Sequence, residues 1–145
     1  MMMFIHFLFS FISTVTFGVI TNVPRRSLLA SGFTGAIGWM VYIGLKALHF
    51  RLGLANFIAA VMIGCFSIYF SRKQKIPMLI FIVPSLVPLV PGGPAYLAVR
   101  EFVLGSPNTG FHYIAVVIVT AGAIAGGFMI TSLVEKIFIH WPTKR

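Results

Sequence analysis

The sequence predicts an all-α fold, a polytopic membrane helical bundle of about five segments with the fourth broken by prolines. Hydrophobic residues make up 59% of the chain and charged residues 9%, at a mean hydropathy of +1.00. Soluble domains carry about 25% charged residues, so this composition is typical of a membrane protein. We expect one integral membrane domain over residues 1–145, with segments near residues 3–21, 28–48, 54–70, 76–104 and 111–139.

The first three segments are apolar runs long enough to cross a bilayer, separated by short polar breaks. Asn22 and Pro24 end the first run, and Arg25 opens the second. A polar group at 46–51 separates the second run from the third, which stops at the basic residues 71–75. Basic residues at the ends of apolar runs are typical of membrane helices, because they sit at the lipid headgroups.

The fourth segment contains five of the chain's eight prolines, between Pro77 and Pro94. Each proline inside a helix removes a backbone hydrogen bond and clashes with the preceding turn. In hydrocarbon a freed carbonyl finds no water, so such a break persists only inside protein or beside a wet cavity. We expect an opened chain, then a half-helix that starts at Pro94 and points its positive end into the membrane, where it suits a carboxylate. The alternative is a proline-rich hairpin that only shapes the bundle.

The candidate substrate path follows from this break. Tyr96 adds a hydroxyl to the new helix, and Arg100 either attracts anions at the mouth or pairs with Glu101 at the membrane surface. The expected path residues are Pro84, Pro88, Pro91, Gly92, Gly93, Tyr96 and Arg100.

The fifth segment, like the second, carries small residues at helical spacing, which let helix backbones approach closely. We expect packing within the chain rather than between subunits. The expected packing glycines are Gly32, Gly35, Gly38, Gly122 and Gly126.

The net charge of +9 is spread over segment ends rather than forming a nucleic-acid face. If the fourth segment crosses, one side of the membrane collects most of the basic residues and the other keeps only Lys46, Arg51 and Arg100. The positive-inside rule then predicts an outside N-terminus and a cytoplasmic C-terminus. A re-entrant fourth segment would move the C-terminal charges to the poorer side, so five crossings are favoured.

Catalysis finds little support in this sequence, and we expect no enzyme, metal or cofactor. The only carboxylates are Glu101 and Glu135, and the four histidines lack metal-ligand spacing. No nucleotide-binding motif is present, so transport through this chain would be secondary.

The PLVPGGPAY run at 88–96, preceded by Lys75-Ile76-Pro77, resembles the threonine/serine exporter (ThrE-type) family. Residues 24–42 are similar to the second helix of that family. The resemblance implies a small, YjjB-like subunit, which corresponds to the C-terminal half of a fused exporter and works with a larger ThrE-type membrane subunit. It also implies export of threonine and serine, or in some two-protein versions of succinate.

The function expected from these observations is that of an exporter subunit for small carboxylate substrates in the bacterial cytoplasmic membrane. Two alternatives stay open: a scaffold subunit that does not transport, and a self-sufficient homo-oligomeric channel. The scaffold would depend on the glycine faces, whereas the channel would carry flux without a partner.

Overall fold

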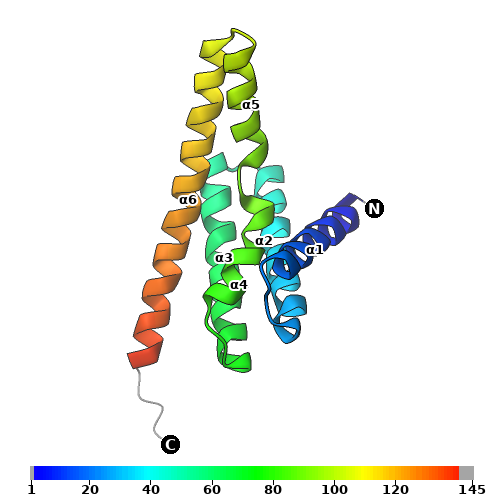
Figure 1. Cartoon of the computed structure of the whole chain (residues 1–145). Helices are drawn as coiled ribbons and strands as arrows, with labels where there is room; N and C mark the ends of the chain where they lie inside the picture. Colours follow the sequence, from blue (N-terminus) through cyan, green and yellow to red (C-terminus); the bar gives the residue numbers. More distant parts are fainter. Residues whose placement is uncertain (1, 141–145) are drawn as a thin grey trace, which may run out of the picture.

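The computed structural model describes residues 2–140, with side chains described as far as Ile137, and all of its regular structure is helical. This confirms the all-α fold. The elements in chain order are α1 Met2–Ile20, α2 Arg25–Ala47, α3 Leu52–Gln74, α4 Leu79–Ser85, the 3₁₀ turn η1 Val87–Leu89, α5 Gly92–Val103 and α6 Pro107–His140 (Figure 1).

The helix ends lie within four residues of the predicted ones. Helices α2 and α6 begin at Arg25 and Pro107, three and four residues before their predicted starts. Helix α3 continues to Gln74 through the basic residues, because Arg and Lys are good helix formers, and it ends where Lys75 adopts a left-handed conformation with φ 55°. Helix α5 begins at Gly92, two residues before the predicted start at Pro94. A proline is tolerated there because N–H groups in a first helical turn lack intrahelical partners.

The broken segment runs from one end of the bundle to the other. A side chain at Gly53 would contact Val119, and one at Gly64 would contact Thr131, so α3 and α6 run in the same direction. The chain between them must therefore return, and α4, η1 and α5 run opposite to both (Figure 1). The two halves of this segment meet at an angle of 50°. Four unbroken helices are long and apolar enough to cross a membrane, and the bent pair is a fifth candidate span.

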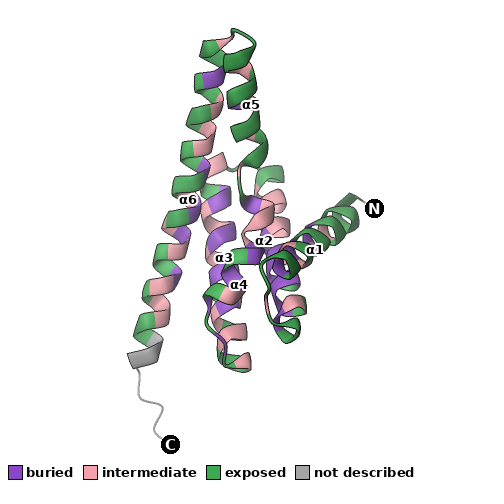
Figure 2. Cartoon of the chain, in the orientation of Figure 1, coloured by how far each residue is buried: buried purple, intermediate pink, exposed green. Residues whose placement is uncertain are grey.

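The core of the bundle lies between α2, α3, α4 and α6, and many of its side chains are small, such as alanine and serine (Figure 2). Side chains added at Gly32, Gly35 and Gly38 would overlap Phe11, Thr14 and Ile63, respectively. These three predicted glycines therefore lie where α2 approaches α1 and α3 most closely.

The two glycines predicted on α6 lie elsewhere. Gly122 has no neighbouring atom within 4 Å of an added side chain, and Gly126 would make only an ordinary contact with Phe57 at 3.6 Å. The close approach to α3 is instead made by Gly127, where an added Cβ would lie 2.8 Å from the Ala60 Cβ. The helical periodicity turns Gly127 toward α3, and Gly122 lies on the exposed side.

Hydrogen bonds and ring packing fix the position of α4. The Ser85 hydroxyl donates to the Ser31 carbonyl oxygen of α2 at 2.9 Å, inside the core. Phe81 is fully buried and stacks on Phe70 of α3, with the ring centroids 6.2 Å apart. The first half of the broken segment is therefore anchored to both α2 and α3.

Candidate functional site

The break between η1 and α5 is the local feature that forms the site. Val90 is extended at φ −60° and ψ 129°, and Pro91 lies at φ −76° and ψ 51°, so neither continues the helix. The Gly92 N–H donates to the Val90 carbonyl oxygen at 2.8 Å, and the Ala95 N–H to that of Pro91 at 3.0 Å. The Gly93 N–H has no backbone acceptor among the described residues. One donor at the start of α5 is therefore free to bind something else.

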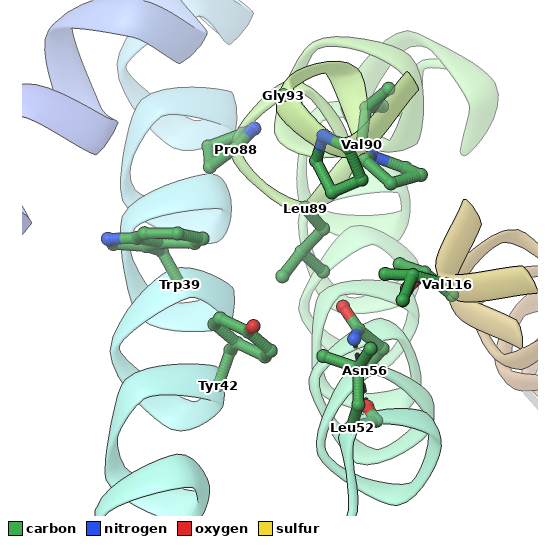
Figure 3. Close-up of a pocket in the computed structure, with 12 residues that line it drawn as sticks. Trp39, Tyr42, Leu52, Asn56, Pro88, Leu89, Val90, Gly93 and Val116 are labelled. Carbon is green, nitrogen blue, oxygen red and sulfur yellow. Dashed lines mark hydrogen bonds between the residues drawn. The ribbon is translucent and has the colours of Figure 1, made fainter. Parts of the chain in front are cut away.

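A cavity of about 270 Å³ lies beside this break and is lined by α2, α3, α6 and the broken segment (Figure 3). Its volume is close to the lower end of the range for small-molecule sites, which begins near 300 Å³. The lining residues are Trp39, Tyr42, Leu52, Asn56, Pro88, Leu89, Val90, Pro91, Gly93, Pro94, Val116 and Thr120.

Three side chains give this apolar cavity its polar groups. Asn56 is 2% exposed, and its Nδ2 donates to the Leu52 carbonyl oxygen at 2.9 Å. Its Oδ1 has no hydrogen-bond partner within residues 2–137, and neither do the hydroxyls of Tyr42 and Thr120. In Figure 3 the side-chain oxygens of Asn56 and Tyr42 face the space below Leu89. A ligand here therefore meets three polar groups that have no hydrogen-bond partner among the described residues.

The cavity carries no charged side chain among its lining residues. Among the lining elements, the positive electrostatic potential comes from the N-terminus of α5, where the helix dipole places a partial positive charge. Such a site suits a molecule with little or no net charge, because an unpaired ion in an apolar cavity is strongly disfavoured.

A second hollow of about 240 Å³ lies on the α1 side of the same wall. It shares Trp39 and Pro88 with the cavity and is otherwise lined by residues of α1: His6, Phe9, Ser10 and Ser13. Trp39 and Pro88 therefore border both hollows.

The structure brings together three of the seven predicted path residues. Pro88, Pro91 and Gly93 line the cavity, whereas Gly92 does not. Pro84 is buried in α4, with its Cβ 3.8 Å from the position of a Cβ on Gly18 of α1.

The remaining two, Tyr96 and Arg100, lie on α5 beyond the cavity. Tyr96 is 68% exposed, and an Arg100 nitrogen lies 3.9 Å from a Glu101 oxygen, with the Arg100 side chain 50% exposed and that of Glu101 18% exposed. A pair with one solvent-exposed partner at this distance contributes little, about 0–1 kcal/mol.

Sequence reasoning did not identify the polar residues that complete the cavity, namely Asn56 and Thr120, and it gave Tyr42 no binding role. Asn56 does carry a signal, since it is an amide in an otherwise apolar run at 54–70. Thr120 carries none, because a threonine in a membrane helix usually bonds to its own backbone.

The model of the family described as Threonine/Serine exporter, ThrE, matches residues 6–134. A "Probable threonine/serine exporter" of Mycobacterium tuberculosis (strain ATCC 25618 / H37Rv) is 26% identical over 120 residues, which is 82% of this chain and 23% of that relative. No solved structure matches. A family match over most of the residues, together with apolar helices able to span a bilayer, establishes that this multi-pass membrane protein belongs to the threonine/serine exporter family.

Proposed function

We propose that this chain forms the substrate path of a threonine/serine exporter and that the cavity at the helix break holds the amino acid. The observation that carries the proposal is the set of unpaired polar groups around an uncharged cavity. Broken helices at membrane depth are the usual construction of transporter binding sites.

A zwitterionic amino acid matches the chemistry of this cavity group by group. Its carboxylate would lie at the N-terminus of α5, near the Gly93 N–H and the positive end of the helix. Its ammonium group would donate to Asn56 Oδ1 and the Tyr42 hydroxyl, which are the free acceptors. The hydroxyl shared by threonine and serine would bond to Thr120, so the site would prefer hydroxy amino acids over apolar ones.

The same argument disfavours a dicarboxylate such as succinate at this site. A dianion would bring two negative charges into a cavity that has no basic side chain among its lining residues. Arg100 is the nearest basic residue along the broken segment, and it lies outside the lining in a pair with Glu101. Without a positive partner, the desolvation of two carboxylates would cost several kcal/mol.

The Trp39–Pro88 wall would act as the internal barrier of the path. A side-chain or backbone shift there would connect the cavity to the hollow beside α1. The prolines of the broken segment support such a shift, because the backbone there has fewer hydrogen bonds to lose.

We further propose that the chain works with a larger subunit, since it covers only 23% of the length of the relative described above. Transport would be secondary and would need no covalent chemistry.

Four basic residues lie at the same end of the bundle, namely Arg25, Arg26, Arg72 and Lys73. By the positive-inside rule that end would face the cytoplasm of a bacterial cell, with the N-terminus outside and the C-terminus inside.

Reconstitution tests the proposal against its two alternatives. Proteoliposomes would hold this chain alone, the larger subunit alone, or both, and uptake of labelled threonine, serine and succinate would be measured. Threonine and serine flux only with both subunits supports the proposal. Flux with this chain alone would instead indicate a homo-oligomeric channel. Flux that survives substitution of Asn56 and Tyr42 would indicate a scaffold role.

A further inference from the structure

The charged residues of α2 and α3 mark a slab that matches the membrane interior. Arg26 and Lys46 are 20 residues apart on α2, a rise of about 30 Å at about 1.5 Å per residue. Arg51 and Arg72 are 21 residues apart along α3, or about 32 Å. A bilayer has a hydrocarbon core about 30 Å thick, so these two helices fit it closely.

The hairpin of α5 and the start of α6 projects beyond this slab (Figure 1). Gly53, at the start of α3, lies beside Val119 of α6, because a Cβ added at Gly53 would lie 3.3 Å from a Val119 methyl group. The two residues therefore stand at the same height along the bundle. The 12 residues 107–118 therefore lie past the start of α3, a distance of about 18 Å. Helix α5 starts at the cavity, beside Leu52 and Asn56, and runs away from the slab along the same stretch of α6.

Most residues of the projecting hairpin are exposed (Figure 2). Large hydrophobic side chains stand exposed along it, with Val99 at 65% and Val103 at 80%. The others are Tyr96, Phe102, Leu104, Phe111, Ile114 and Ile118. Four polar or charged residues are exposed among them: Arg100, Asn108, Thr109 and His112. Lipid tails cover such side chains within the slab but not beyond it, and burying apolar surface stabilises by about 25 cal/mol per Å². Large exposed apolar side chains that gather outside lipid are typical of a protein interface.

The hairpin has the internal packing of a preformed surface. Gly105 turns the chain with φ 80°, and the Ser106 N–H donates to the Glu101 carbonyl oxygen at 2.9 Å. Phe102 packs over Gly110, where a side chain would overlap its ring, and meets Phe111 edge to face at 5.2 Å. Because this packing already holds α5 against α6, binding a partner would cost little conformational entropy for ordering this surface.

We infer that the exposed face of the α5–α6 hairpin, centred on Val99 and Val103, is the docking surface for the larger subunit, outside the hydrocarbon on the Lys46–Arg51 side of the membrane. This inference rests on the proposed function, which supplies the partner. The relative that resembles this chain has about three quarters of its length outside the match. We take the occupant to be an apolar segment of the larger subunit that corresponds to that unmatched part.

Site-specific photo-crosslinking tests the position of the interface. The crosslinking residue p-benzoylphenylalanine would replace Val99 and, as a control of matched exposure, Met129, which is 69% exposed on α6 inside the slab. The chain would be co-expressed with the tagged larger subunit. We expect an adduct with that subunit from position 99 and at least tenfold less from position 129. Equal adducts from both, or an adduct only with a second copy, would overturn the inference.

A polar substitution supplies a second readout. Val103→Asn places an amide at a site that is 80% exposed, so the isolated chain should fold as well as before. We expect at least tenfold less larger subunit to co-purify with this variant. Unchanged co-purification would overturn the docking surface but leave the proposed function intact. Failure of the proposed function would look different, because the larger subunit would then be unnecessary for flux with the wild-type chain.

Discussion

Replacing Asn56 by leucine removes one polar group from the cavity while keeping nearly the same volume. The Leu52 carbonyl oxygen loses the Asn56 Nδ2 donor, but it keeps its helical hydrogen bond because the backbone is unchanged. Net loss of one neutral hydrogen bond costs about 0.5–1.5 kcal/mol, and an apolar replacement in a buried position offsets part of it. The variant should therefore fold with a melting temperature close to that of the wild type.

The effect on threonine should be much larger. A hydrogen bond between Asn56 Oδ1 and an ammonium group is worth about 1.5–3 kcal/mol, because one partner is charged. At about 1.4 kcal/mol per factor of ten, its loss raises the Kd for threonine roughly 10- to 100-fold. Binding would be measured by titration of the purified complex, and the concentration for half-maximal export in proteoliposomes.

Ser67→Ala is the matched control for Asn56→Leu. The Ser67 hydroxyl is fully buried on the same helix and has no hydrogen-bond partner among the described residues, yet it does not line the cavity. Its removal should leave threonine binding unchanged. The reasoning is refuted if a well-folded Asn56→Leu variant binds threonine within twofold of wild type, or if both variants weaken binding equally.

Three further outcomes are expected. Gly64→Val would overlap Thr131 at the α3–α6 contact and should lower the melting temperature in detergent by at least about 3 °C. Gly122→Ala meets no neighbouring atom and should leave the melting temperature unchanged or raise it. Equal melting temperatures for the two variants would contradict this packing. Pro88→Ala combined with Pro91→Ala returns two backbone N–H donors and straightens the segment. Export should therefore fall more than tenfold, while the thermal stability is unchanged or rises. Undiminished export would contradict a role of the helix break in transport. A 100-fold excess of succinate should not slow threonine export, because the cavity has no basic lining residue; competition at equimolar succinate would show that a dianion binds.

The spans and their ends could be predicted from the sequence because hydrocarbon allows few alternatives. Apolar runs must be helical there, and the polar group at 46–51 and the basic residues at 71–75 mark the ends of α2 and α3. The proline spacing likewise predicted the break, since Pro84, Pro88 and Pro91 cannot share a regular helix.

The partners of the break could not be predicted, because they come from three other helices. Asn56, Thr120 and Tyr42 meet the broken segment only through the register of α2, α3 and α6. That register depends on close contacts such as Gly38 on Ile63. Spacing alone marked Gly122 and Gly126 as the packing pair, whereas the orientation of α6 gives the close contact to Gly127.

Substrate protection of a cysteine in the cavity tests the central claim most directly. In a Cys65→Ser background, which removes the chain's only cysteine, Val116→Cys places a thiol in the cavity lining and Met129→Cys one on the outer face of α6. The rate of maleimide labelling would be measured with the larger subunit present. Threonine and serine should slow labelling at position 116 and not at 129, and succinate should slow neither. Labelling at position 116 that is indifferent to threonine would contradict the assignment of this cavity as the substrate path.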